Sequence, residues 1–341
     1  MALYLGLVIF SFLITSVAIV PFIDFLYHLH FTYHSPIPPT TNLEKVEFTA
    51  MQSRNRWKIG TPVGGGILLV FLVSLLFAFL FPLLSRLGLY IHSNYSLKEE
   101  LNIIFFTFVS FGLLGLFDDI IKIFNLQRIV GKISGYRTVV KVILSFIVAI
   151  LLHQNLGLNS IFLFPFGTIN MGIWYIPVTA ALLFIFSRAV NITDGIDGLA
   201  AGCLLIAFMA MWVISFTMLD TPISVFIALW VGALIAFLYF NVYPARIWLG
   251  NTGALSFGAT FVLLGILLGK LGPTLVIGGV FMSEFLSWAI QSFSVHILHR
   301  KIFSISPLHY FLESKGWPEP KISMRTWLIS IILCFFGLWL S

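Results

Sequence analysis

The stretch "ALLFIFSRAVNITDGIDGLAAGCLLIAFMAMWV", residues 181–213, places two aspartates between two runs of almost continuous apolar residues. Such runs are typical of helices that span a lipid bilayer, where a carboxylate is costly to hold. The rest of the chain has the same character, because 59% of its 341 residues are hydrophobic and only 9% are charged. A soluble domain carries about 25% charged residues. The composition therefore predicts an all-α, polytopic integral membrane protein.

Apolar runs of spanning length predict about ten transmembrane helices. They fall at about 3–27, 63–85, 101–117, 139–153, 173–187, 198–216, 222–240, 255–269, 274–297 and 326–341. The first run lacks the small-residue cleavage site of a signal peptide, so we expect a retained span. No second domain and no repeat of fixed period is visible. Residues 1–341 are therefore predicted to form one membrane domain, with a polar linker at 28–62 and a polar loop at 298–325.

Positive charge is concentrated in alternate loops. Of the 19 lysines and arginines, all but Arg86, Lys98 and Lys270 lie in the loops at 28–62, 118–141, 188–197, 241–254 and 298–325. By the positive-inside rule these loops face the cytoplasm, and both termini face outward. The resulting basic face would attract anionic lipid head groups or a phosphorylated substrate. Nucleic acid is not indicated, because no basic domain lies outside the membrane spans.

The acidic residues gather at the same membrane level. Asp118 and Asp119 end the third span, in "GLLGLFDDIIKIF", and Asp194 and Asp197 end the fifth. Hard oxygen ligands beside lysines suit Mg²⁺ bound together with the phosphates of a substrate. The alternative is that these acids only cap helices and balance nearby cations. Four acids from two segments on one face favour the phosphate and metal interpretation.

Other polar residues accompany these acids. Asn191 lies one helical turn before Asp194, and Lys122 follows Asp118 at i+4. In "KIGTPVGGGI", residues 58–67, Lys58 precedes a glycine-rich helix start, which either binds an anion through exposed N–H groups or only allows close packing. In "FNVYPARIWLGNTGALSFGA", residues 240–259, Trp248 either stacks on a base or anchors at the interface. Glu284, in the middle of a span, is expected to make a hydrogen bond between helices.

Four segments resemble the polyprenyl-phosphate N-acetylhexosamine-1-phosphate transferases: "FDDIIK", "NITDGIDGLA", "FNVYPARIWLGNTGALSFG" and "RKIFSISPLHYFLESKGWPEPKISMRTWLIS". The ending "KGWPEPK" is similar to that of one branch, the phospho-N-acetylmuramoyl-pentapeptide transferases. The resemblance extends from about Lys58 to the C-terminus and implies a ten-span enzyme of the bacterial inner membrane with a cytoplasmic active-site cleft. Such an enzyme transfers phospho-MurNAc-pentapeptide from its UDP carrier to undecaprenyl phosphate with Mg²⁺. The products are lipid I, which serves peptidoglycan synthesis and with it cell shape and division, and UMP.

The resemblance also implies roles for single residues. Asp118 and Asp119 would be the catalytic aspartate pair and would bind Mg²⁺ together with Asn251, and His309 would belong to a catalytic histidine motif. The substrate-binding residues would be Lys58, Lys122, Asn191, Asp194, Asp197, Asn241 and Trp248. The family also suggests a homodimer.

The chain departs from the family pattern at its centre. Asn251 stands where the pattern has a metal-binding aspartate, and Tyr310 and Phe311 replace two histidines. Arg188 and Thr138 stand where asparagine and lysine are expected. Two interpretations stay open: a divergent but active transferase, or a homologue that keeps the fold and the nucleotide pocket with little or no turnover.

Two further classes compete with this interpretation. A sister transferase would use UDP-GlcNAc or another UDP-HexNAc donor. A transporter or flippase would set its acids near the midplane of broken helices from two repeats, whereas here they gather at one face. The enzyme interpretation requires that the side chains at 118, 119, 194, 197 and 251 meet in one inward-opening pocket.

Overall fold

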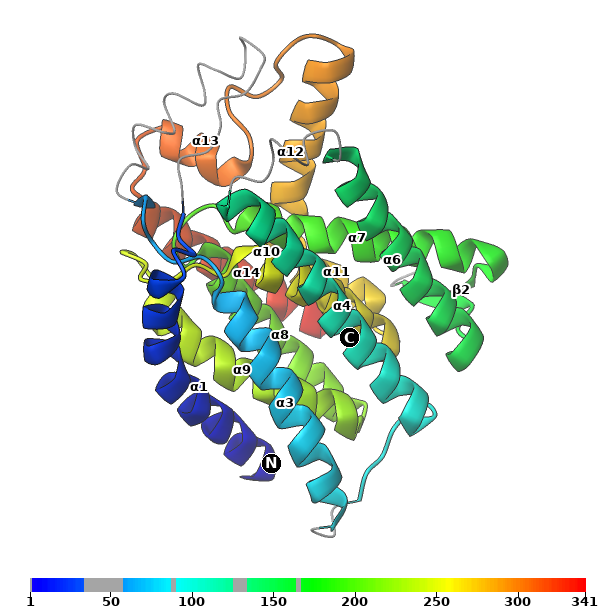
Figure 1. The fold of residues 1–341 in the computed structure, drawn as a ribbon. Coiled ribbons are helices and arrows are strands. Elements are labelled where there is room, and N and C mark those ends of the chain that lie inside the picture. Colours follow the sequence, from blue (N-terminus) through cyan, green and yellow to red (C-terminus); the bar gives the residue numbers. More distant parts are fainter. Residues whose placement is uncertain (1, 34–57, 87–89, 125–133, 164–166) are drawn as a thin grey trace.

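The structure, a computed structural model, describes residues 2–33, 58–86, 90–124, 134–163 and 167–341 (Figure 1). Most of the predicted linker at 28–62 lies outside these residues. The helices are α1 (Ala2–His28), α3 (Gly65–Arg86), α4 (Leu97–Ile123), α6 (Ser134–Leu156), α7 (Tyr175–Thr193), α8 (Leu199–Thr217), α9 (Thr221–Asn241), α10 (Gly250–Leu267), α11 (Leu271–Ile277), α12 (Gly279–Ile297), α13 (Leu308–Ser314) and α14 (Glu319–Trp339). In the described residues the only sheet is an antiparallel hairpin of β1 (Ser160–Leu163) and β2 (Gly167–Asn170). The all-α prediction is confirmed.

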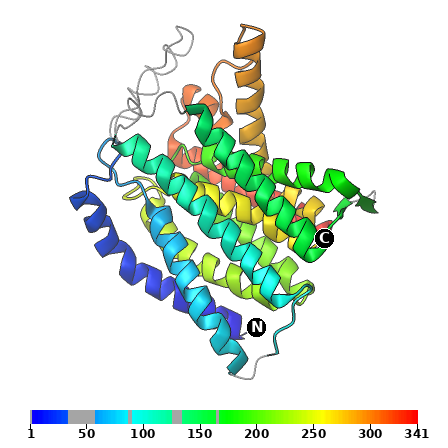
Figure 2. The ribbon, with the colours of Figure 1, turned by 45° about the vertical axis from the view of Figure 1, so that its right-hand side comes forward.

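Nine helices of the described chain are long and apolar enough to cross a membrane. The pair α11 and α12, bent by 73°, brings the number to ten if the two helices together form one broken span. The sequence had predicted one continuous span at 274–297. The break falls at Gly278, where an added Cβ would lie 2.5 Å from a ring carbon of Phe186 on α7. After the bend, α12 projects away from the other helices in both views (Figures 1 and 2).

The loops divide between two faces as the charge pattern predicts. On one face, the Thr221 N–H donates to His92 O at 2.9 Å and Lys270 Nζ donates to Ser341 O at 2.5 Å. The Tyr4 ring packs on Phe216 near this face, with the two centroids 4.9 Å apart, so both termini lie there. The opposite face carries the polar motifs around Asp118, Asp194 and Asn251. Which face meets the cytoplasm stays a prediction from the positive-inside rule.

Helix α10 is the centre of the bundle, because every one of its residues is buried. Its first turn lies against glycines of two neighbouring helices. An added Cβ on Gly115 of α4 would lie 2.3 Å from the Asn251 carbonyl oxygen, and one on Gly66 of α3 would lie 2.1 Å from the Gly253 nitrogen. Small residues let membrane helices approach this closely. The start of α10, which carries Asn251, is therefore held by α3 and α4.

Gly115→Ala is expected to separate α4 from α10 and to lower the free energy of unfolding by about 1–3 kcal/mol, because the new methyl group meets rigid backbone. The thermal unfolding midpoint in detergent measures the effect. Gly6→Ala in α1 is the matched control, since nothing lies within 4 Å of its added Cβ. Equal midpoints for the two variants would contradict the close approach.

Candidate active site

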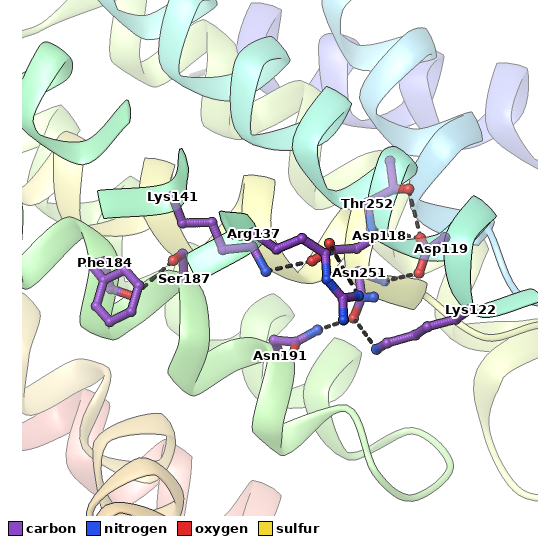
Figure 3. Close-up of polar contacts among 10 residues, drawn as sticks. All are labelled: Asp118, Asp119, Lys122, Arg137, Lys141, Phe184, Ser187, Asn191, Asn251 and Thr252. Carbon is purple, nitrogen blue, oxygen red and sulfur yellow. Dashed lines mark hydrogen bonds and ion pairs between the residues drawn. The ribbon is translucent and has the colours of Figure 1, made fainter. Parts of the chain in front are cut away.

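Asp119 closes the amino end of α10. Its two carboxylate oxygens accept the N–H groups of Asn251 and Thr252, both at 2.9 Å, and the Thr252 hydroxyl at 2.8 Å. These N–H groups have no partner within the helix, and the helix dipole favours a negative charge at this end. Asp119 is 2% exposed. It therefore acts as a cap supplied by a neighbouring helix (Figure 3).

Asp118, the adjacent residue, faces α6 and its cations. Lys141 Nζ lies 2.5 Å from Asp118 Oδ2, and Arg137 Nη1 lies 3.8 Å from Asp118 Oδ1. Arg137 and Lys141 are four residues apart on α6 and so share one face of that helix. Figure 3 shows both pointing toward Asp118. Asp118 is thus the acid of a cationic cluster, whereas Asp119 is the cap of a helix.

Arg188 on α7 adds another cation to this region. It interacts electrostatically with Asp118 and Arg137, and its guanidinium lies 5.3 Å from the ring centroid of Trp288. A cation over an aromatic face is held by the ring quadrupole. Arg188, which departs from the family pattern, therefore adds positive charge near Asp118.

Asn251 links three helices through one oxygen. Its Oδ1 accepts Lys122 Nζ at 3.2 Å and also a close hydrogen bond from Asn191 Nδ2 (Figure 3). Lys122 belongs to α4 and Asn191 to α7. The amide oxygen of Asn251 therefore faces an ammonium group.

The turn between α7 and α8 carries Asp194. Its Oδ2 accepts the Gly250 N–H at 3.1 Å, which ties this turn to the start of α10. Gly198, the last residue of the turn, has φ +71°, a conformation that favours glycine. Burial disfavours the charged form of the Asp194 carboxyl and raises its pKa to about 7. Repulsion by Asp119 and Asp197 adds to this, while the hydrogen bond from Gly250 and the attraction to Lys122 oppose it.

This raised pKa predicts a pH dependence of stability. The ordinary value is 3.8, so between about pH 4 and pH 7 folded Asp194 holds a proton that the unfolded chain has lost. The contribution of Asp194 to stability is therefore expected to rise as pH falls through this window. Asp194→Asn removes the effect, so the variant should gain stability over the parent at about pH 8 and not at about pH 4. Unfolding midpoints of both proteins across this range measure it; parallel curves would contradict the assignment.

Asp197 belongs to a second cluster beside the first. Its Oδ2 accepts the Ala245 N–H at 2.9 Å, while Lys58 Nζ lies 2.9 Å from Glu319 Oε2 on α14 and 5.1 Å from the ring centroid of Trp248. Lys58 and Asp197 attract one another, and repulsion between Asp194 and Asp197 connects the two clusters electrostatically. The pKa of Asp197 is raised by burial.

Two further residues shape the surroundings of Trp248. The Tyr33 ring lies 5.2 Å from that of Trp248 between centroids. Asn241 is buried, and its Nδ2 donates to Ile247 O at 2.9 Å. The structure thus places Asn241 at the end of α9, with its amide bonded to the loop that carries Trp248.

His309 lies behind the 194–197 turn. Its Nδ1 is 3.0 Å from Glu284 Oε2, and its backbone N–H donates to Glu284 Oε1 at 3.2 Å. The expectation that Glu284 makes a hydrogen bond to another helix is confirmed, since His309 lies in the first turn of α13. An added Cβ on Gly195 would lie 2.4 Å from His309 Nε2, and the Tyr310 hydroxyl donates to Gly195 O at 3.4 Å. His309 and Tyr310 therefore pack against the 194–197 turn at Gly195.

The contacts join Asp119, Asp194 and Asn251 at the start of α10. Asp118 contacts the cations of α6 instead and is connected to this cluster by its attraction to Lys122, and Asp197 lies in the adjoining cluster. Sequence reasoning had not assigned Arg137, Lys141 and Glu319 to the site. The i, i+4 spacing of the first two was a detectable sign, whereas the pairing of Glu319 with Lys58 joins residues far apart in the chain.

The predicted Mg²⁺ ligands do not offer free oxygens in this arrangement. Asp119 accepts three hydrogen bonds, Asn251 Oδ1 faces the Lys122 ammonium, and Asp118 faces two cations. Among the described residues, no three of His, Cys, Asp and Glu are placed to hold a metal ion. An ion at Asn251 would have to displace Lys122 against charge repulsion. In this arrangement the donor set does not fit Mg²⁺. Mg²⁺ binding at Asp118, Asp119 and Asn251 therefore rests on the family resemblance and stays a prediction.

The comparisons agree with this assembly of motifs. Residues 101–269 match the family described as "Glycosyl transferase family 4". The phospho-N-acetylmuramoyl-pentapeptide-transferase of Oceanobacillus iheyensis is 30% identical, over 98% of this chain and 96% of its own. That of Geobacillus sp. is 32% identical over the same shares, and that of Clostridium novyi is 32% identical over 82% of each chain.

The fold and the site therefore define a polytopic membrane glycosyl transferase, with its polar motifs gathered at one face of the helix bundle. More closely, the chain belongs to the phospho-N-acetylmuramoyl-pentapeptide-transferase family. The resemblance predicted from the sequence motifs is confirmed.

Proposed function

We propose that this chain transfers phospho-MurNAc-pentapeptide from its UDP carrier to undecaprenyl phosphate in the bacterial cytoplasmic membrane, and so makes lipid I for peptidoglycan synthesis. One observation carries the proposal: three family motifs, from α4, from the turn after α7 and from the start of α10, contact one another. Asp119 bonds to Asn251, Asp194 to Gly250, and Asn191 to Asn251. Family membership over nearly the whole chain supports it.

The reaction joins two anions. An oxygen of the lipid phosphate attacks the sugar-side phosphorus of the UDP carrier, a new P–O bond forms, and the bond to the departing UMP phosphate breaks with its electron pair on UMP. Catalysis of such transfers consists mostly of positioning and of neutralising charge. Lys122, Arg137, Lys141 and Arg188 lie around Asp118 and Asn251 and supply positive charge.

Asp194 is suited to accept the proton of the lipid phosphate. The second pKa of a phosphate monoester is about 6, so a base with a pKa near 7 is sufficient. The raised pKa of Asp194 matches this requirement. In the second cluster, Trp248 offers an aromatic face for the uracil ring, and the Lys58–Glu319 pair holds that region together.

UMP release from UDP-MurNAc-pentapeptide and undecaprenyl phosphate by the purified full chain tests the proposal. Lipid I and UMP should appear in equal amounts, and UDP-GlcNAc should be a poor donor. UMP release from UDP-GlcNAc alone would favour the sister transferase, and lipid flux across vesicles without UMP would favour a flippase. Absence of turnover with either donor would identify a homologue that has kept only the fold. We also propose a homodimer from the family resemblance, which light scattering of the purified chain tests.

A further inference from the structure

Four basic side chains surround the place where three family motifs meet. We call Lys122, Arg137, Lys141 and Arg188 the cation cluster. Arg137 and Lys141 contact Asp118, Lys122 contacts Asn251, and Arg188 of α7 interacts electrostatically with Asp118 of α4. They come from three different helices, α4, α6 and α7, so tertiary packing brings them together.

The cation cluster outweighs the acids that face it. Asp118 is the carboxylate in direct contact with it. Asp119 and Asp194 attract Lys122, while their oxygens accept N–H groups at the start of α10, so three acids face four cations. Asn251, at the centre, is neutral. Lys141 is buried and Arg137 and Arg188 are half-buried, whereas Lys122 is exposed. Positive charge that is partly removed from water needs an anionic partner. The site is therefore short of negative charge, and a phosphate ligand would supply it.

Arg188 has hydrogen-bond donors to offer such a ligand. A guanidinium carries five N–H donors in a planar fork that matches phosphate oxygens. Within the part of the chain that the structure describes, its interactions are the stacking on Trp288 and electrostatic ones with Asp118 and Arg137. Stacking on a ring holds the fork in place and leaves its N–H edge available. Arg188 is half-buried, so water screens it only in part.

We propose that the cation cluster binds the diphosphate of the UDP carrier directly, and that this chain needs no divalent cation at Asn251 to do so. The inference rests on the proposed function and concerns how the same site neutralises its substrate. Lys122 on Asn251 Oδ1 holds positive charge at the position that the metal was predicted to occupy, and Arg188 adds a further one. The cation cluster would thus neutralise the charge of the diphosphate in place of Mg²⁺.

Binding of UDP to the purified full chain, measured by calorimetry, tests this directly. The dissociation constant with EDTA should lie within about threefold of the value with excess MgCl₂. Arg188→Gln should weaken UDP binding by about tenfold or more with EDTA, since a charge-assisted hydrogen bond is lost. Arg188→Lys should recover part of the affinity. Arg86→Gln removes a charge on the opposite face and is the matched control, expected to leave affinity unchanged.

A second variant, Asn251→Asp, tests the inference independently. The added carboxylate removes one unit of excess positive charge and creates a charged metal ligand. UDP binding by this variant should weaken about tenfold with EDTA and recover with MgCl₂. Farnesyl phosphate, a short lipid monophosphate, tests whether the cation cluster binds the phosphates of the nucleotide or the phosphate of the lipid. Arg188→Gln should affect the binding of farnesyl phosphate less than that of UDP.

Three binding results would each overturn the inference: wild-type binding of UDP that is lost with EDTA, equal affinities for Arg188→Gln and Arg86→Gln, or a larger effect of Arg188→Gln on farnesyl phosphate than on UDP. UMP release that requires MgCl₂ would agree with the proposed function and contradict the inference. UDP binding that survives EDTA, without UMP release in any condition, would support the inference and contradict the proposed function.

Discussion

Asp118→Ala is expected to lower the rate of UMP release by about 10²–10³-fold. Asp118 is the carboxylate that contacts Lys141 and Arg137, at 2.5 Å and 3.8 Å. Without it, the two cations repel one another and lose the geometry in which they can meet developing negative charge on phosphate. The initial rate of UMP formation measures the effect, together with the KM for the UDP donor, because poorly placed cations should reduce kcat more than they weaken binding.

Two variants serve as controls for this result. Asp118→Asn keeps an oxygen for Lys141 but no charge, so its rate should fall between those of wild type and Asp118→Ala. Asp24→Ala removes an exposed acid at the end of α1 and should leave the rate unchanged. If Asp118→Ala kept wild-type turnover, Asp118 would be only a structural counter-charge for Lys141 and Arg137.

Asp119→Ala is expected to lower the free energy of unfolding by ~3–5 kcal/mol. The substitution removes three hydrogen bonds at a buried position and leaves the N–H groups of Asn251 and Thr252 without an acceptor. Because α10 is buried along its whole length, loosening its first turn should destabilise the bundle and the site together. The thermal unfolding midpoint of the detergent-purified chain measures the loss.

The controls separate a cap from a catalytic group. Asp119→Asn keeps one carbonyl oxygen and should lose less stability than Asp119→Ala. Thr252→Val removes only the hydroxyl contact and should cost about 1 kcal/mol. If Asp119→Ala instead unfolded at the wild-type midpoint and lost only turnover, the carboxylate would act on substrate and not on α10.

The sequence alone determined that the molecule is a helical membrane protein and that its polar site lies at one membrane face. An apolar content of 59% requires helices, because only a hydrogen-bonded helix or a closed barrel satisfies backbone groups in lipid. The charge pattern separated the loops into two sets, and contacts such as Lys270 with Ser341 confirm that separation. The motifs around Asp118, Asp194 and Asn251 identified the family before any contact was known, because local spacing within a motif does not depend on distant packing.

Only the tertiary structure decided what each side chain contacts. Asp118 and Asp119 are indistinguishable in the sequence, but neighbours on a helix point about 100° apart, so one meets α6 and the other meets α10. At the bend between α11 and α12, Gly278 packs closely on Phe186 of another helix, and the partner of Glu284 is His309, 25 residues away. Arg137, Lys141 and Arg188 surround Asp118 only because three helices pack there. Hydrophobic periodicity is local and can be read along the chain, whereas charge neutralisation acts through space between segments that only folding brings together.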